Sequence, residues 1–238
     1  MKYKLKRLFS IGLILICCSS CNAQSKLVKE EFRIVVNEEI KYYLYYPSGY
    51  EDNMSKEYGL LLFLHGGGET SANAKGEAIP PKILMDGTEF PFLVLAPQHD
   101  KEKKWWDTKA VKQLLDTVVQ NNRIDTKRIY LSGLSRGGGA AWEMAVQYPD
   151  TFAALAIVCG MAPTPYAHWI NKEMPIWVFH GEDDPVIPIS ESEEIVARLK
   201  SLHYKIQFTR YKNTGHNAWD KAYRTPALFT WMQNQKKK

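Results

Sequence analysis

The chain has 238 residues, of which 45% are apolar and 24% are charged, and its formal net charge is +5. These are ordinary proportions for one globular domain with a substantial core, and the length argues against a second domain. The basic excess lies at the two ends, since removal of residues 1–20 leaves 27 basic against 26 acidic residues. We therefore expect no nucleic-acid partner, and we expect Lys236–Lys238 to form a solvated tail.

The N-terminus has the pattern of an export signal. An apolar run covers residues 8–18 and is too short to span a bilayer. It is preceded by four cations, Lys2, Lys4, Lys6 and Arg7. Because a cationic start and a short apolar run are typical of secretory signals, we expect residues 1–20 to be a signal peptide.

Two processing routes fit this signal. Small residues precede Cys21, which resembles the processing site of a bacterial lipoprotein, although Cys18 replaces the usual Leu. Cleavage after Ala23 by an ordinary signal peptidase is the alternative. In the first case a lipid on Cys21 would attach the protein to a membrane of the bacterial cell envelope. Residues 21–30 would then be a tether and residues 31–238 the folded domain.

Short apolar strands alternate with amphipathic helices along the rest of the chain. We expect a hairpin at 32–36 and 42–46, strands starting near 60, 93, 128, 152, 176 and 206, and helices at 110–121, 136–147, 191–202 and 225–235. This alternation favours an α/β fold with a mainly parallel, eight-stranded sheet and helices on both faces. Only about 15 residues separate Cys159 from Pro175, so we expect no helical lid there and a site open to solvent.

A Gly-x-Ser-x-Gly motif at 133–137 joins an apolar strand to a helical pattern. Such a motif is typical of a nucleophile elbow, in which Ser135 occupies a sharp, strained turn. Gly133 and Gly137 would keep Cβ atoms out of the crowded space around it. The N-terminus of the following helix would face any anion that forms beside Ser135.

The strand at 60–64 runs into three glycines after His65. Glycines there can present backbone N–H groups to a negative oxygen without side-chain obstruction. We therefore expect the N–H groups of Gly67 and Arg136 to form an oxyanion hole. A glycine-rich turn or a phosphate loop is the alternative, but a phosphate loop would require Gly-Lys-Ser/Thr after the glycines, and none follows.

A carboxylate and an imidazole follow the last two expected strands. Asp183 and Asp184 lie in the turn after the strand at 176–180, and either could be an orienting acid. His216 lies in the loop after the strand at 206–211. The order Ser, Asp, His along the chain is that of an α/β-hydrolase triad.

From about Arg33 to its end, the chain resembles the α/β-hydrolase superfamily, on the segments LLLFLHGGGE, RIYLSGLSRGG, WVFHGEDDPVIP and GHNAWDKAY. It is similar to the small esterase branch, with dienelactone-hydrolase-like proteins, phospholipase/carboxylesterases, feruloyl and acetylxylan esterases and predicted peptidases. The resemblance implies Ser135 as nucleophile, His216 as base and Asp184 as acid, because the family's Asp directly precedes Pro-Val-x-Pro. Arg136 departs from the family's usual Met; it could favour acidic substrates, and we prefer an ion pair with a neighbouring helix.

Several loop aromatics could line the site. Trp219 follows His216 by three residues and, with Trp106, is our candidate for substrate binding. The other candidates are Trp105, Tyr166 and Trp169. The alternative is that most of these rings anchor loops, with Trp105 and Trp106 balanced between the two roles.

The remaining reactive residues suggest structural roles. His65 and His180 close strands before glycine, so we expect them to be buried, hydrogen-bonded supports of the oxyanion and acid loops. Cys159 is the single cysteine of the folded domain, which excludes a disulfide within it, and we expect a small buried hydrophobe rather than a nucleophile. No set of His and acidic residues has metal-ligand spacing, so we expect neither a metal nor another cofactor.

These observations favour an exported serine carboxylesterase. Its substrates would be short-chain or aromatic acyl esters, either small molecules or esters carried on polysaccharides. A peptidase of the same fold is the alternative, because one triad can cleave both bonds. A binding protein that has lost its chemistry is a third hypothesis, against which the intact Ser, Asp and His argue.

Overall fold

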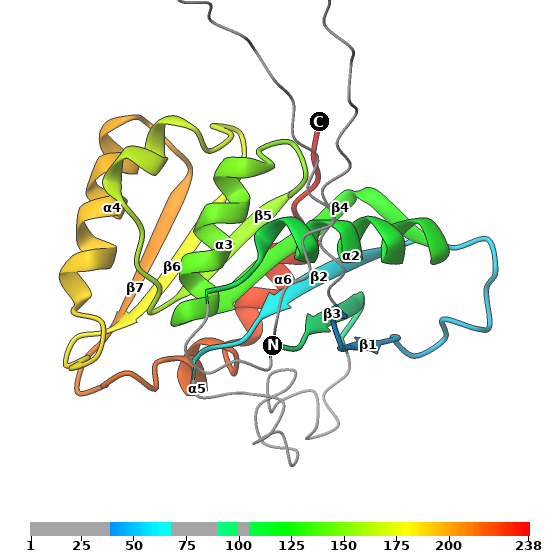
Figure 1. The fold of residues 1–238 in the computed structure, drawn as a ribbon, viewed down its shortest axis with the longest axis horizontal. Helices are drawn as coiled ribbons and strands as arrows, with labels where there is room; N and C mark the ends of the chain where they lie inside the picture. Colours follow the sequence, from blue (N-terminus) through cyan, green and yellow to red (C-terminus); the bar gives the residue numbers. More distant parts are fainter. Residues whose placement is uncertain (1–38, 68–89, 100–104) are drawn as a thin grey trace, which may run out of the picture. The chain divides into compact units, whose positions relative to one another are not determined.

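Seven strands form one sheet in the computed structural model, which describes residues 39–67, 90–99 and 105–238 (Figure 1). In chain order they are β1 Tyr42–Tyr45, β2 Tyr58–Leu64, β3 Leu93–Pro97, β4 Ile124–Leu134, β5 Ala154–Val158, β6 Ile176–Gly181 and β7 Ile206–Tyr211. The spatial order is β1-β3-β2-β4-β5-β6-β7, and only the β1–β3 pair is antiparallel among these strands. The mainly parallel α/β sheet is confirmed. The eighth strand, expected at 32–36, lies outside the described residues, as do the expected signal peptide, tether and Cys21.

Helices cover both faces of the sheet, as the alternating pattern predicted. They are α2 Thr108–Asn121, α3 Arg136–Gln147, η1 Thr164–His168, α4 Ile189–Ser201, α5 Trp219–Ala222 and α6 Pro226–Gln233. One core cluster packs α2, α3 and α4 on one face, and a second packs α5 and α6 on the other (Figure 1). Because both faces are covered, every residue of β2, β3 and β5 is buried.

Helix ends differ from the expected ranges where local capping decides them. The helix expected at 110–121 begins at Thr108, because Asp107 caps it by accepting from the backbone N–H groups of Lys109 and Ala110. The boundaries of α3 are those expected. The short η1 and α5 were not predicted, since helical periodicity needs more than one turn to be visible. Among the described residues, none of the helices has the length and apolar composition of a membrane span.

Backbone contacts join α3 to the strands beneath it. A Cβ on Gly137 would overlap the carbonyl oxygen of Leu64 at the end of β2, and a Cβ on Gly133 would overlap the carbonyl oxygen of Gly137. Both glycines of the motif are therefore required by close approach of peptide groups. This packing places the turn between β4 and α3 at the same sheet edge as the loop after β2.

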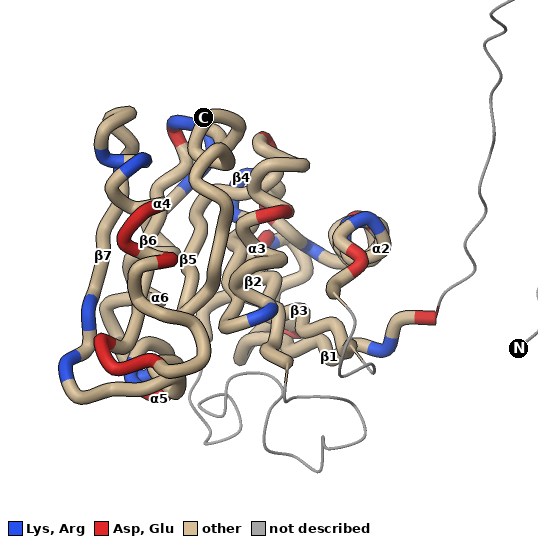
Figure 2. The backbone as a smooth tube through the Cα atoms, turned by 60° about the vertical axis from the view of Figure 1, so that its left-hand side comes forward, with Lys and Arg blue, Asp and Glu red and all other residues tan. Residues whose placement is uncertain are grey.

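The C-terminal lysines are solvent-exposed at Lys236 and Lys238, whose side chains are 57% and 83% exposed, but the tail is also anchored to the domain. The backbone N–H of Lys237 donates to the Lys127 carbonyl at 2.9 Å, and its Nζ donates to the Asp150 carbonyl at 2.8 Å. Lys236 and Lys238 form ion pairs with Asp125 and Glu173. Figure 2 shows basic and acidic segments beside each other near the C-terminus. A run of like charges in sequence does not show which distant carbonyls and acids will face it.

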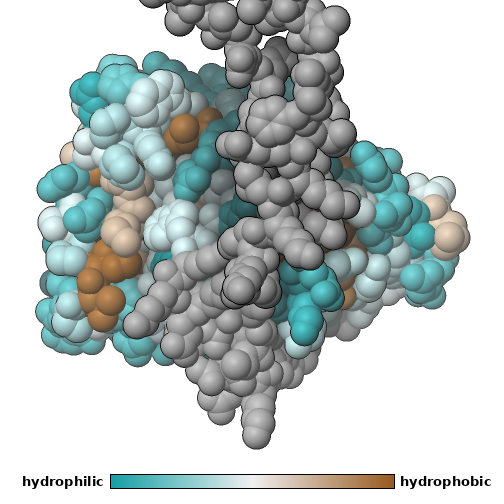
Figure 3. All heavy atoms as spheres, viewed as in Figure 1, coloured by the Kyte–Doolittle hydropathy of each residue, from teal (hydrophilic) through white to brown (hydrophobic). Residues whose placement is uncertain are grey.

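The outer surface matches the ordinary composition. In Figure 3 most of the coloured surface is hydrophilic or neutral, and the hydrophobic patches are small and separate. The large hydrophobic side chains that are most exposed among the described residues include Met54, Trp169 and Val186. Scattered exposure of this kind is normal for a globular domain.

Candidate active site

Ser135 lies between β4 and α3 in a backbone conformation that is rare for residues other than glycine. Its φ angle is 51°, and its N–H donates to the Val158 carbonyl of β5 at 2.9 Å. Its own carbonyl accepts from Gly139 N–H at 3.0 Å, which is the first hydrogen bond of α3. A strained residue at a strand-to-helix turn is the geometry that the Gly-x-Ser-x-Gly motif predicts.

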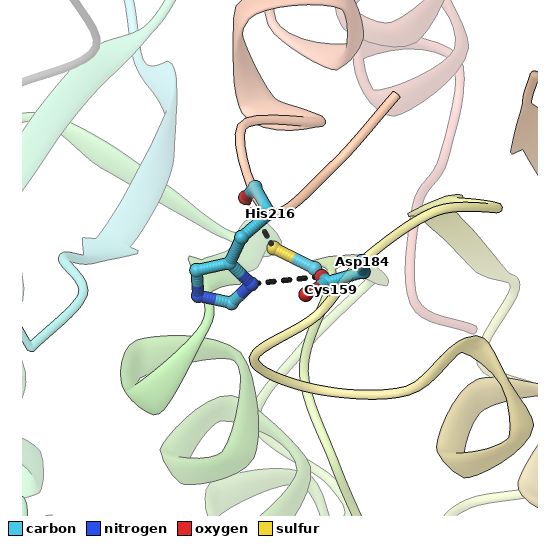
Figure 4. A group of neighbouring side chains, drawn as sticks. All are labelled: Cys159, Asp184 and His216. Carbon is cyan, nitrogen blue, oxygen red and sulfur yellow. Dashed lines mark hydrogen bonds and ion pairs between the residues drawn. The ribbon is translucent and has the colours of Figure 1, made fainter. Parts of the chain in front are cut away.

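A chain of hydrogen bonds joins three side chains at this edge of the sheet. Ser135 Oγ lies 2.9 Å from His216 Nε2, and His216 Nδ1 lies 2.8 Å from Asp184 Oδ2. Because the carboxylate can only accept, Nδ1 carries the proton and Nε2 is the acceptor for the Ser135 hydroxyl. The three residues follow β4, β7 and β6, whose carboxyl ends meet at one edge. Figure 4 shows the imidazole of His216 directed at Asp184.

The two oxygens of Asp184 have separate partners. Oδ1 accepts from the backbone N–H groups of Val186 and Ile187 at 2.9 and 3.0 Å, while Oδ2 accepts from His216. Burial acts to raise the pKa of Asp184, but the hydrogen bonds from His216 and from the two N–H groups outweigh it and the pKa is lowered. Asp183 is exposed, so Asp184 is the carboxylate of this turn that meets the imidazole.

His180 supports the loop after β6 that carries Asp184. Its side chain is fully buried, its Nε2 donates to the Ile187 carbonyl at 2.9 Å, and its Nδ1 accepts from Ser192 Oγ at 2.7 Å. His180 Nε2 also lies 3.3 Å from Asp184 Oδ2. The expected buried, hydrogen-bonded role is confirmed. Ser192 was missed, although a signal exists: it is a polar residue on the apolar stripe of α4.

His65 supports the loop after β2 in a similar way. The ring is buried; its Nδ1–H donates to the Gly66 carbonyl at 2.8 Å and its Nε2 accepts from His99 N–H at 2.9 Å. Burial lowers the pKa of His65 to about 4, so the ring is neutral at physiological pH. Because the Gly66 carbonyl and the Gly67 N–H belong to one planar peptide, fixing the carbonyl also fixes the direction of the N–H.

Gly67 lies beside the Arg136 side chain, and the oxyanion hole expected from their N–H groups stays a prediction. A Cβ on Gly67 would lie 3.9 Å from Arg136 Cζ, and Arg136 Nη2 donates to the Gly66 carbonyl at 3.4 Å. The Arg136 N–H belongs to the first turn of α3, where N–H groups have no acceptor within the helix. Burial lowers the pKa of the Arg136 guanidinium. Its ion pair with a neighbouring helix stays a prediction.

The two tryptophans proposed for substrate binding lie in different environments. The Trp219 ring packs edge-on against His216, with centroids 5.3 Å apart, and is partly exposed. Trp106 is only 5% exposed; its ring packs against His65, and its Nε1 donates to the His65 carbonyl at 3.3 Å. Trp106 is therefore a loop anchor, and its assignment as a wall of an open site is wrong, because the ring fills the core beneath His65.

Cys159 lies beside this hydrogen-bond chain and forms, with Asp184 and His216, a cluster whose potential ligand atoms are within 4.8 Å of one another (Figure 4). Metal binding would need a thiolate and an unprotonated ring nitrogen. Burial raises the pKa of the Cys159 thiol to about 12, its Sγ donates to the His216 carbonyl, and Nδ1–H is engaged by Asp184. The donor set therefore fits a proton relay with a buried thiol beside it.

A parallel sheet with a strained Ser at an elbow, followed by Asp and His at the same edge, defines the α/β-hydrolase fold. Residues 76–230 match the model of the phospholipase/carboxylesterase family, and the chain belongs to this family.

Known proteins of related sequence include hydrolases of esters. The chain is 28% identical over 196 residues to the bifunctional acetylxylan esterase/xylanase XynS20E of Neocallimastix patriciarum, which covers 79% of this chain and 27% of that protein. It is 26% identical over 234 residues to poly(3-hydroxyalkanoate) depolymerase C of Paucimonas lemoignei, covering 78% and 55%. A thermostable esterase of known structure has 29% identity and a TM-score of 0.72, covering 83% of this chain and 60% of its own. The chain thus spans about a quarter of the length of the first sequence relative and about half of the second.

Proposed function

We propose that the protein is an exported serine carboxylesterase that hydrolyses short-chain or aromatic acyl esters, including esters carried on polysaccharides. The observation that carries the proposal is the unbroken hydrogen-bond chain from Ser135 through His216 to Asp184. A hydroxyl held at 2.9 Å from a neutral imidazole nitrogen has a base for its proton as it attacks a carbonyl.

The reaction proceeds in two acyl transfers. Ser135 Oγ attacks the ester carbonyl carbon while His216 Nε2 takes the hydroxyl proton, and Asp184 stabilises the imidazolium that forms. The N–H groups of Gly67 and Arg136 donate to the oxyanion. The bond to the alcohol then breaks, and His216 returns its proton to the leaving oxygen. Water repeats the sequence on the acyl-enzyme, which releases the acid and restores the Ser135 hydroxyl.

The short connection between β5 and β6 supports substrates with a bulky alcohol. This connection holds only the short η1 and no lid. The His216 side chain, 19% exposed, is reachable from solvent. The names of the relatives, an acetylxylan esterase/xylanase and a polyester depolymerase, are consistent with esters presented on polymers. Export rests on the signal at 1–20, and attachment to the bacterial envelope rests on Cys21.

The nucleophile is tested with a fluorophosphonate probe and ester hydrolysis on the full chain. The wild type should be labelled on Ser135 and should hydrolyse nitrophenyl acetate, whereas Ser135→Ala should lose labelling and reduce turnover by several powers of ten. His216→Ala should lose labelling as well. Ser132→Ala, which changes a buried serine of β4, is the control and should keep both activities. Near-normal turnover by folded Ser135→Ala would disprove the assignment.

The substrate class is tested by comparing acyl and leaving groups. Nitrophenyl acetate, butyrate and octanoate should show falling kcat/KM with chain length, and acetylated and feruloylated xylan should release free acid. A peptide panel should remain intact. Cleavage of peptides with higher kcat/KM than any ester would favour the peptidase. Export is tested by cell fractionation with Cys21→Ala, which should abolish lipid labelling; unchanged labelling would reject the anchor at this residue.

A further inference from the structure

Trp105 is exposed to solvent yet firmly held. The side chain is 45% exposed, and its Nε1 donates to Glu143 Oε2 at 2.7 Å. The other oxygen of Glu143 accepts from Gln147 Nε2 at 2.8 Å and lies 3.1 Å from Thr108 Oγ1, whose hydroxyl proton it shares with Gln147 Oε1. The carboxylate that fixes the indole is therefore itself fixed from two helices, so the ring loses little freedom when something packs on it.

Helix α3 has a glycine, Gly139, where this indole packs against it. Glycine within a helix costs about 1 kcal/mol relative to alanine, yet three glycines in succession follow Arg136 in α3. Close backbone contacts account for Gly137 and Gly138, with the Leu64 carbonyl and the Gly160 Cα respectively. At Gly139 the nearest group is a side chain: a Cβ would lie 2.6 Å from Cη2 and 3.0 Å from Cζ2 of Trp105.

The held ring lies close to the nucleophile. Gly139 N–H donates to the Ser135 carbonyl, so the ring edge meets α3 one turn after Ser135, a rise of about 6 Å. The Met161 carbonyl lies 3.3 Å from the same Cβ position, and the Met161 side chain is 42% exposed. The near edge of the indole is therefore one helical turn from Ser135, and its Nε1 lies a further turn along α3, at Glu143.

We propose that Trp105 is a stacking platform for a sugar ring in the alcohol part of the substrate. This inference rests on the proposed esterase function and deepens it. A pyranose has one face of C–H groups that packs on an aromatic ring, while its hydroxyl groups stay in water. A half-exposed aromatic suits such an amphipathic ring. A planar aromatic acyl group, which is apolar on both faces, would instead gain most from an enclosed slot.

The test compares esters that share an acetyl group and differ in the alcohol. Trp105→Ala should raise KM for an acetylated xylo-oligosaccharide about tenfold with little change in kcat, which corresponds to about 1.4 kcal/mol. Hydrolysis of triacetin, which has no ring, should be unchanged. Trp105→Phe should retain part of the affinity. Tyr43→Ala, which removes an aromatic that is 53% exposed on β1, is the matched control and should leave both substrates unaffected.

A second variant moves the ring without removing it. Gly139→Ala places a methyl group where the indole edge lies, and alanine favours the helix, so the fold should persist while KM for the oligosaccharide rises as in Trp105→Ala. Normal oligosaccharide KM in both variants would overturn the platform. An equal rise in KM for triacetin would also overturn it, since it would indicate a purely structural role for the ring. A rise in KM confined to methyl ferulate would overturn it as well, since it would place the ring at the acyl group.

The two proposals fail in distinguishable ways. A wild-type protein that hydrolyses triacetin but no sugar ester would overturn the platform and leave the esterase standing. A wild-type protein that is neither labelled by fluorophosphonate nor active on triacetin would overturn the esterase itself.

Discussion

Replacing Asp184 by Asn should disable the site and leave its loop in place. The Asn carbonyl oxygen takes the Oδ1 position, because the N–H groups of Val186 and Ile187 both require an acceptor there. The Asn NH₂ then faces His216 Nδ1 and donates to it. The imidazole is forced to carry its proton on Nε2, where it can no longer accept the proton of Ser135.

The size of the effect follows from the bonds that are exchanged. The two backbone bonds that fix the loop survive, so the variant should stay folded, although the free energy of unfolding should fall because the fold stabilises the ionised carboxylate, as its lowered pKa shows. The charge-assisted bond from Nδ1, at 2.8 Å, is lost together with the acceptor function of Nε2. We expect kcat to fall by about 10³ to 10⁴, or roughly 4 to 5.5 kcal/mol at 1.36 kcal/mol per factor of ten.

The assay is steady-state hydrolysis of nitrophenyl acetate at pH 7.5, with circular dichroism and urea unfolding on the same samples. Asp183→Asn is the matched control, since Asp183 is the exposed neighbour in the same turn and should keep near-normal kcat. If Asp184→Asn kept more than a tenth of wild-type kcat, or if Asp183→Asn lost as much, the assigned path of the proton would be wrong.

Three further predictions concern the surroundings of the site. The pKa of His65 is about 4 in the folded protein against 6.5 in the unfolded chain, so the unfolded chain takes up a proton at higher pH and the free energy of unfolding should fall by about 2.5 kcal/mol between pH 7 and 4.5. In His65→Gln, urea unfolding should show a smaller fall over the same pH range. An equal pH dependence of the free energy of unfolding in the two proteins would refute the reasoning. Cys159 should resist iodoacetamide at pH 8 until the chain is unfolded, which peptide mapping will show, whereas rapid native labelling would contradict a buried thiol with a pKa of about 12. Deleting residues 236–238 should lower the free energy of unfolding by about 1–2 kcal/mol without changing kcat, because the hydrogen bonds of Lys237 are lost. An unchanged urea midpoint would show that the anchoring contributes no stability.

Local patterns were sufficient to predict the elbow and the sheet edge. The boundaries of α3 could be read from the glycines and the apolar stripe, because elbow geometry and helix periodicity are both local. The carboxyl ends of parallel strands share one edge, which is why residues as distant as Ser135 and His216 could be expected to meet. The choice of Asp184 over Asp183 needed the family resemblance, since the residues of the turn left both open.

What depends on distant partners could not be predicted. Trp105 and Trp106 are adjacent in sequence, yet one is 45% exposed and the other 5%. Their orientation depends on Glu143 and His65, which lie on other elements, and no loop pattern contains that information. The anchoring of the C-terminal lysines could not be predicted for the same reason, because their acceptors lie about 65 to 110 positions earlier in the chain.

The glycines at 133 and 137 have a consequence for how this molecule can change. No side chain separates the peptide groups that meet at these two glycines, so a substitution there acts directly on the spacing between the elbow and the end of β2. A methyl group at either glycine would displace both the nucleophile Ser135 and the loop after β2, which makes these two positions the hardest to substitute during evolution.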